Sequence, residues 1–238
     1  MPIVKAVLTG HSRGLGAAIA AELARRGIPV MALARKQGAE MPGLTQVAMD
    51  LSDTAALSAW LAGGTLQAFL AGADTALLVN NAGMLQPVGP LSSQAPADVA
   101  RAISLNVAVP LMLAAAVAAV DATERRVLHV SSGAGRNAYP GWAVYCAGKA
   151  ALDHHARAAA LDQAAGLRIV SLAPGVIDTD MQAQIRATDV EHFPLLDQFQ
   201  ALKANGALAS PADCAQRLVA FALSPDFGAT AVADLRDF

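Results

Sequence analysis

Charge and cysteine are both scarce in this chain of 238 residues. Charged residues make up 15% of it, the formal net charge is −2, and no basic block is present. This balance argues against nucleic acid or an anionic membrane surface as the main partner. The two cysteines, Cys146 and Cys214, lie far apart and form no C-x-x-C spacing. They support neither a disulfide framework nor a zinc site, and they are typical of a reducing cytoplasm.

The sequence also lacks an apolar segment long enough to predict a membrane span. Its longest apolar run, residues 107–120, is interrupted by Pro110 and is shorter than the ~20 residues that a span needs. We therefore expect a buried helix there and no membrane partner. A strand pattern begins within the first few residues, so no signal peptide is expected before it. No metal pair is expected either, because the adjacent His154 and His155 would point about 100° apart on a helix.

Apolar residues are abundant, at 55%, and they follow two alternating patterns. Short aliphatic runs alternate with longer alanine-rich helical runs, which predicts a doubly wound parallel sheet of about seven strands with helices on both faces. We expect one Rossmann-type domain over residues 1–238, with an irregular lid over residues 174–210. The expected strands lie near 3–10, 28–35, 75–83, 125–132, 167–175 and 229–235, and the expected helices near 15–27, 96–120, 142–166 and 211–223.

Three glycines stand between the first expected strand and the first expected helix, in the stretch "TGHSRGLG". Gly10, Gly14 and Gly16 would let the backbone approach a phosphate, and the helix N-terminus behind them would offer free N–H groups. We interpret this loop as a dinucleotide site. The spacing is G-x-x-x-G-x-G and not the general G-x-G-x-x-G, so a tight turn with close helix packing is the alternative.

The glycine stretch is the first of five motifs that resemble, in the same order, the short-chain dehydrogenase/reductase family. The others are "NNAG" at residues 80–83, "VSSGAG" with Ser131 and Ser132, "YCAGK" with Tyr145 and Lys149, and "APGVIDTDM" after the sixth strand. Ser132 precedes Tyr145 by thirteen positions, which is the usual spacing in that family. The resemblance covers the whole chain and implies a Rossmann fold, a nicotinamide cofactor and a Ser-Tyr-Lys catalytic set.

Tyr145 and Lys149 are four residues apart and would share one face of a helix. A free tyrosine has a pKa near ~10, and a neighbouring ammonium favours the phenolate, so we expect Lys149 to lower the pKa of Tyr145. Tyr145 could then act as general acid for ketone reduction or as base for alcohol oxidation, with Ser132 holding the carbonyl oxygen. The alternative is an ordinary helix with an exposed lysine and a half-buried tyrosine.

A fourth catalytic candidate is Asn106, which stands four residues before Pro110. Proline has no N–H, so the carbonyl of Asn106 loses its helical partner and is free to hold a water. The resemblance implies that this carbonyl helps a proton relay reach Lys149. A proline kink that only shapes packing is the alternative.

The end of the second expected strand predicts which nicotinamide is used. An acidic residue there would bind the ribose 2′-hydroxyl of NADH, but this chain has Ala34 and Arg35, with Arg13 in the glycine loop. Arginine can pair with a phosphate through two parallel hydrogen bonds, so we expect NADPH in preference to NADH; two surface arginines are the alternative. The cofactor contacts that the resemblance implies are Gly10, Ser12, Arg13, Gly14, Leu15, Gly16, Arg35, Asp50, Leu51, Asn81, Ala82, Gly83, Tyr145, Lys149, Pro174, Gly175, Ile177 and Thr179.

The C-terminal third resembles the branch of the family that contains sepiapterin reductases and bacterial benzil reductases. The stretches "DTDMQ" and "GATAVADLRDF" carry this likeness. In that branch an aspartate near the C-terminus anchors the pterin; Asp234 is the best match and Asp237 its rival. A carboxylate in a terminal turn is the alternative. Trp142, which precedes the catalytic helix, is expected either to border the substrate pocket or to serve ordinary packing.

These features together predict an NADPH-dependent carbonyl reductase of small aromatic or dicarbonyl compounds. Two alternatives stay open: a non-catalytic protein that senses NADP(H), and an alcohol dehydrogenase working in the oxidative direction. The two long alanine-rich helices suit a dimer interface, although they also suit the core of a monomer. We therefore expect a cytoplasmic homo-oligomer, with a dimer favoured.

Overall fold

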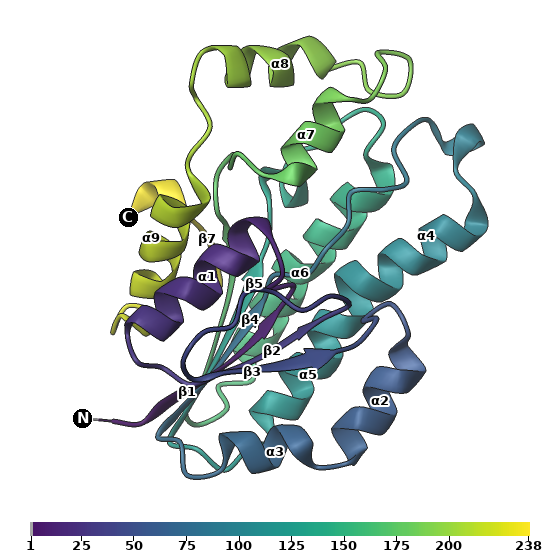
Figure 1. Cartoon of the computed structure of the whole chain (residues 1–238). Coiled ribbons are helices and arrows are strands. Elements are labelled where there is room, and N and C mark those ends of the chain that lie inside the picture. Colours follow the sequence, from purple (N-terminus) through teal and green to yellow (C-terminus); the bar gives the residue numbers. More distant parts are fainter. Residues whose placement is uncertain (1) are drawn as a thin grey trace.

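The computed structural model describes residues 2–238, whose strands form one seven-stranded parallel sheet. The strand order is β3-β2-β1-β4-β5-β6-β7, so the chain winds outward from β1 in both directions (Figure 1). This order confirms the predicted doubly wound fold. The strands are β1 (Val4–Thr9), β2 (Val30–Ala34), β3 (Leu44–Ala48), β4 (Thr75–Asn80), β5 (Glu124–Val130), β6 (Leu167–Ala173) and β7 (Val232–Asp234).

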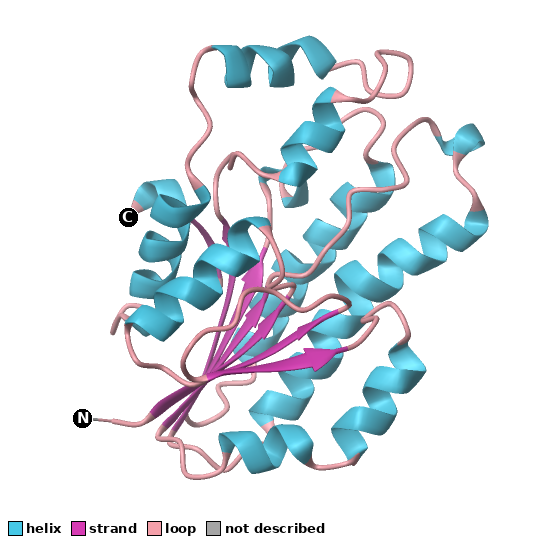
Figure 2. Ribbon diagram, viewed as in Figure 1, coloured by secondary structure: helices cyan, strands magenta, loops and turns pink. Residues whose placement is uncertain are grey.

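Helices cover both faces of the sheet (Figure 2). One face carries α1 (Gly14–Arg25) and α9 (Pro211–Leu223). The other carries α2 (Thr54–Ala62), α3 (Thr65–Leu70), α4 (Pro96–Ile103), α5 (Val109–Ala118) and α6 (Ala143–Leu161). Shorter turns are the 3-10 segments η1 (Leu91–Ser93), η3 (Gly133–Gly135) and η4 (Leu235–Asp237), and the π-helical turn η2 (Ser104–Ala108).

Alternation of side chains along the strands divides the apolar core into two layers. In β1, Ala6 and Leu8 pack on the side of α1 and α9, whereas Val7 packs on the side of α5. All three side chains are fully buried. Because both faces are covered, a central strand such as β2 is apolar along its whole length, which is the pattern the sequence showed.

The long helix expected near residues 96–120 is present and runs from α4 through η2 into α5. By length and composition alone, Pro96–Ala118 could cross a membrane, with a mean hydropathy of 1.7 in its most apolar window. In the fold it is a layer of the domain, because Val109, Leu113 and Val117 pack into the core beneath the sheet. One side of this helix is therefore core packing, and 33% of its most apolar window is buried within the chain.

Residues 174–210, called the lid below, are not the irregular stretch that the sequence suggested. They contain α7 (Asp180–Arg186) and α8 (Leu196–Ala204), which Figure 1 shows beyond the carboxyl ends of the strands. A short bridge between Ile177 and Ala209 ties the two ends of the lid together. Helices of seven and nine residues present too few turns for a periodic apolar pattern, which explains why the sequence did not reveal them.

Candidate active site

The glycine loop joins β1 to α1 and has the backbone that its sequence requires. Gly10 and Gly14 have φ of +74° and +54°, a region that side chains disfavour. A Cβ on Gly16 would lie 2.0 Å from the carbonyl oxygen of Gly10, so the loop and the helix touch at a point where only glycine fits. The first turn of α1 has no side-chain cap and no acidic residue. Its N–H groups are therefore available to an anion.

A second loop, after β4, is hydrogen-bonded to the glycine loop. The Asn81 side-chain amide donates to the carbonyl oxygens of Thr9, at 3.0 Å, and Gly10, at 3.2 Å. In return, the Thr9 hydroxyl accepts from the backbone N–H groups of Asn81 and Ala82, at 3.0 and 2.9 Å. The structure thus brings these predicted cofactor residues together. Sequence reasoning missed Thr9, whose only signal is its place before Gly10.

The three predicted catalytic residues meet at the carboxyl end of β5. Lys149 and Tyr145 are both buried on α6, and the Lys149 ammonium lies 5.6 Å from the centre of the Tyr145 ring. The Lys149 Nζ donates to the carbonyl oxygen of Val130 at 2.7 Å. Ser132, two residues after Val130, lies close enough to the Tyr145 hydroxyl to lower its pKa. The three side chains therefore form one compact set.

Burial dominates the ionisation of this set. It raises the pKa of Tyr145 to about 12, against the lowering effect of Ser132. It also lowers the pKa of Lys149 to about 8, against the attraction of the Asp153 carboxylate. The expectation that Lys149 would bring the pKa of Tyr145 below its ordinary value is therefore wrong for the protein alone. Removing the phenol from water disfavours the phenolate more strongly than Ser132 favours it.

Asn106 joins the catalytic set to the loop after β4. Its side chain accepts from the Met84 N–H at 2.9 Å and donates to the Met84 carbonyl at 2.8 Å. It lies in the π-helical turn η2, just before Pro110, where the sequence predicted an interrupted helix. A Cβ on Gly83 would lie 3.3 Å from the Asn106 Oδ1 and 3.9 Å from the Lys149 Nζ. Asn106, Gly83 and Lys149 are thus neighbours.

The predicted adenosine end of the site lies at β2 and β3. Arg13 and Arg35 are both exposed, and Arg13 pairs with Asp180 of α7 at 3.1 Å. Two hydrogen bonds from Ser52 lower the pKa of Asp50, with a smaller contribution from Arg35 and Arg101. The other residues predicted here are the half-buried Ser12 and the buried Leu15 and Leu51.

The predicted nicotinamide end lies where the lid begins. A Cβ on Gly14 would touch the Thr179 side chain at 3.5 Å, so the first residues of the lid adjoin the glycine loop. Gly175 has φ of +84°, and a Cβ there would lie 3.7 Å from the Arg236 side chain. Pro174 is half-buried and Ile177 is buried.

An aromatic cluster joins the lid to the catalytic helix. Trp142 stacks on Phe193 of the lid, with ring centres 4.7 Å apart, and meets the edge of Tyr145 at 5.6 Å. Phe199 of α8 also packs against Trp142, at 5.4 Å. Trp142 is 4% exposed and packs in this cluster, and its place beside Tyr145 fits both roles that the sequence left open.

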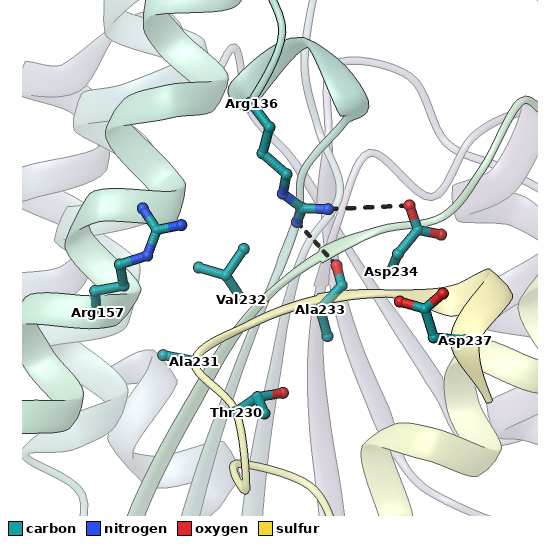
Figure 3. Close-up of a pocket in the computed structure, with 8 residues that line it drawn as sticks. All are labelled: Arg136, Arg157, Thr230, Ala231, Val232, Ala233, Asp234 and Asp237. Atoms are coloured by element: carbon teal, nitrogen blue, oxygen red, sulfur yellow. Dashed lines mark hydrogen bonds and ion pairs between the residues drawn. The ribbon is translucent and has the colours of Figure 1, made fainter.

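Asp234 ends β7, and Asp237 lies in η4 directly after it. Both line a cavity of about 500 Å³ beside β7, together with Arg136 and Arg157 (Figure 3). Ser132, Tyr145 and Lys149 are not among the residues that line it. The Asp234 carboxylate accepts from the Arg236 guanidinium at 2.8 and 2.7 Å, so its acceptor oxygens are already paired. Among residues 2–238 no cluster of side chains suited to a metal ion is found.

Comparison with known proteins places this geometry in a family. A family model described as short chain dehydrogenase matches residues 4–190. The chain belongs to the short-chain dehydrogenase family. It is an oxidoreductase of the Rossmann fold, as the five motifs implied.

The relatives of this short-chain dehydrogenase include benzil reductases and sepiapterin reductases. Benzil reductase ((S)-benzoin forming) of Bacillus cereus is 32% identical over 86% of this chain and 88% of its own. Sepiapterin reductase of Meriones unguiculatus is 33% identical over 97% of this chain and 95% of its own. Among solved structures, a short-chain dehydrogenase/reductase from Burkholderia vietnamiensis is 47% identical, with a TM-score of 0.70 and 100% of both chains covered.

Short-chain dehydrogenases use nicotinamide cofactors, and the loops described above fit such a group. Gly16 permits a contact between loop and helix that a Cβ would block, and the uncapped start of α1 offers N–H groups to a pyrophosphate. Gly83 leaves space beside Lys149 and Asn106, where a ribose hydroxyl would find an ammonium and an amide. The residues present are therefore those that a dinucleotide needs.

Proposed function

We propose that this short-chain dehydrogenase is an NADPH-dependent carbonyl reductase of small aromatic ketones or dicarbonyl compounds. The observation that carries the proposal is the meeting of Ser132, Tyr145 and Lys149 beside the loop that carries Gly83. A hydroxyl, a phenol and an ammonium converge there, next to a site built for a dinucleotide. That arrangement supports proton transfer to a carbonyl oxygen.

When bound, NADPH supplies the hydride that reduces the carbonyl carbon. Tyr145 donates the proton to the carbonyl oxygen, a role that suits a phenol whose pKa of about 12 keeps it protonated. Ser132 donates a hydrogen bond to the same oxygen and fixes its position. Lys149 stabilises the phenolate that forms and binds the ribose, and Asn106 supports a proton relay that returns a proton to the site. The same residues would serve alcohol oxidation in reverse.

The preference for NADPH is inferred from two guanidinium groups. Arg35 follows β2, where an acidic residue would bind a 2′-hydroxyl, and Arg13 lies in the glycine loop. Both are exposed and can turn toward a 2′-phosphate. Arg13 would then exchange its ion pair with Asp180 for one with the phosphate.

Aromatic dicarbonyls are favoured over pterins by the charges around β7. A pterin presents a guanidine-like edge that needs a free carboxylate, but Asp234 already binds the Arg236 guanidinium through both of its oxygens. Tyr145, by contrast, adjoins the aromatic ring of Trp142 and, through it, Phe193. An apolar aromatic substrate bound at Tyr145 would therefore lie beside an aromatic cluster, against which its ring could pack.

The experiment that tests this function is NADPH consumption with a panel of carbonyl compounds. Benzil, a simple aryl ketone, an aliphatic diketone and sepiapterin would be compared, with NADH in parallel. We expect turnover with NADPH that is fastest with benzil. Binding of NADPH without turnover of any carbonyl or of the matching alcohols would contradict the proposal and favour a protein that senses the cofactor.

We further propose that the protein works as a cytoplasmic homodimer through the outer faces of α4–α5 and α6. Only 33% of the most apolar window of Pro96–Ala118 is buried within one chain, and Ile103 and Leu161 are exposed. Light scattering should give twice the mass of one chain. A monomeric mass at micromolar concentration would contradict this assembly.

A further inference from the structure

A buried carboxylate lies directly behind the catalytic set. Asp153 stands one helical turn after Lys149 on α6 and is 1% exposed. Its Oδ1 accepts from the hydroxyls of Ser131 and Ser171, each at 2.7 Å, and its Oδ2 accepts from the Arg136 Nε at 3.0 Å. A carboxylate this deeply buried is costly unless its oxygens are paired, and these are. The proposed reaction gives Asp153 no part in proton transfer.

Two of these three donors bracket the loop that carries the catalytic serine. Ser131 comes just before Ser132, and Arg136 comes just after η3. Between them, Gly135 is seated so closely on α6 that a Cβ would lie 3.0 Å from the Asp153 Oδ2 and 3.0 Å from the Lys149 carbonyl oxygen. The whole loop therefore rests on the turn of α6 that holds Lys149 and Asp153.

The far side of the loop is held by the last strand. In Figure 3 the Arg136 side chain reaches toward both the carbonyl of Ala233 and the carboxylate of Asp234. Its Nη2 donates to the Ala233 carbonyl at 2.9 Å, and its Nη1 lies 3.9 Å from the Asp234 carboxylate. Arg136 thus joins Asp153 to β7, and the serine loop is clamped between α6 and the C-terminal strand.

We propose that Asp153 is a positioning residue for Ser132, and that it acts by holding Ser131 and Arg136 on either side of it. This inference rests on the proposed carbonyl reduction. Tyr145 and Lys149 belong to one helix, which fixes their relation to each other. Ser132 belongs to a loop, so its distance from the Tyr145 hydroxyl depends on contacts such as these. A displacement of the order of 1 Å at such a site can cost ~100-fold in rate.

Two serine variants separate positioning from stability. Ser131 and Ser171 bond the same oxygen at the same 2.7 Å, but only Ser131 adjoins the catalytic loop. We expect Ser131→Ala to lower kcat for the best carbonyl substrate about tenfold with an unchanged KM for NADPH. Ser171→Ala should lose a similar amount of thermal stability and keep kcat within about twofold. Equal losses of kcat in the two variants would overturn the proposal.

A double-mutant cycle tests whether the effect passes through Ser132. Ser132→Ala alone should lower kcat on the order of 100-fold, as loss of an oxygen-binding donor does. If Asp153 and Ser131 act by placing that hydroxyl, Ser131→Ala should have no further effect in the Ser132→Ala background. Multiplicative losses would indicate a purely structural role and overturn the proposal. Asp153→Asn, which keeps the size of the side chain, should follow the same pattern with a larger loss.

Hydrogen exchange gives a readout that does not depend on turnover. Backbone amides of residues 131–137 should exchange faster in Ser131→Ala than in the wild type, and should be unchanged in Ser171→Ala. Unchanged exchange in Ser131→Ala would overturn the anchoring itself. If the loop loosens but the wild-type protein reduces no carbonyl, the proposed function fails and the catalytic part of this inference fails with it.

Discussion

The residues proposed for the reaction and the lid above them are held in place by different forces. The reaction region, defined as residues 9–16, 80–83 and 131–149, is fixed by hydrogen bonds such as those of Asn81 to the glycine loop and of Lys149 to the backbone of β5. The lid is fixed by apolar contact, with Phe193 stacked on Trp142. Hydrogen bonds set direction as well as distance, whereas ring packing tolerates small shifts.

Polar groups of the lid add little to this packing. Asp178 pairs with Lys203 and, at 3.9 Å, with Arg186, but both pairs are at least partly exposed. Exposed ion pairs contribute ~0–1 kcal/mol each. The comparison teaches that changes in the reaction region should alter rates and cofactor choice, while changes in the lid should alter substrate affinity.

The largest effect is expected from Tyr145→Phe. The variant keeps the ring that packs against Trp142 and loses only the hydroxyl that donates the proton. General acid catalysis is worth up to ~10⁴-fold, and we expect kcat to fall by about 10³-fold while the Kd for NADPH stays within about twofold. Stopped-flow NADPH oxidation and fluorescence titration measure the two quantities. Retained turnover would remove Tyr145 from the mechanism.

Cofactor choice should respond next most strongly, in Arg35→Asp. A carboxylate after β2 would repel a 2′-phosphate and accept a 2′-hydroxyl, so the ratio of kcat/KM for NADPH to that for NADH should fall about 100-fold. Arg26→Asp, directly after α1, provides a charge-matched control at the opposite end of the helix from the glycine loop, where Arg26 pairs with Glu22. An unchanged ratio in Arg35→Asp would take Arg35 out of the cofactor site.

The conformation of the glycine loop and the shared helix of Tyr145 and Lys149 could be predicted from sequence, because both depend on local geometry. Gly10 and Gly14 need positive φ, Gly16 must lack a side chain, and four-residue spacing alone puts Tyr145 and Lys149 on one helix face. Each of these requirements is met within a few residues of chain. They therefore restrict the residue types at particular positions, and this restriction can be recognised in the sequence.

The features that the sequence concealed depend on contacts between distant segments. The residues around Trp142 in the sequence do not predict that Phe193 stacks on it. Those around Asp153 do not predict that the Ser171 hydroxyl donates a hydrogen bond to its carboxylate. The raised pKa of Tyr145 has the same origin, because burial is a property of the assembled fold. At the sheet edge, β3 has five residues and none of them is fully buried, so its short pattern was too weak to locate.

The pH dependence of the reaction should report the burial of Lys149. Its pKa of about 8 lies below the ordinary 10.5, whereas Tyr145 stays protonated up to about 12. We expect kcat/KM for NADPH, which reports the free enzyme, to fall about tenfold per pH unit above pH 8. Lys149→Arg, whose charge persists, should lose this limb. Since burial penalises the protonated lysine, its contribution to stability should rise between pH 8 and 10.5.

Phe193→Ala tests the contribution of the lid to substrate affinity. This fully buried ring is the stacking partner of Trp142, and its loss should cost about 3–5 kcal/mol of local or global stability. We expect KM for an aromatic substrate to rise about tenfold while the Kd for NADPH is retained. Phe227→Ala, equally buried but packed with α9, is the matched control and should lose stability without a change in KM. A parallel loss of NADPH affinity in Phe193→Ala would break the division between the two regions.

The smallest effect is expected at the ion pair that joins the reaction region to the lid. Arg13 of the glycine loop pairs with Asp180 of α7 at 3.1 Å, and both side chains are about two-thirds exposed, at 64% and 65%. Such a pair holds the lid only weakly, but it competes with a 2′-phosphate for the same guanidinium. Asp180→Asn should therefore tighten NADPH binding about twofold and leave NADH binding unchanged, since NADH has no phosphate to compete. Titration of both cofactors at low ionic strength would show it, because salt screens the pair and the phosphate alike. Equal tightening of NADH would mean that Asp180 acts on the lid itself, and the ion pair would then belong to the packing of the lid and not to cofactor choice.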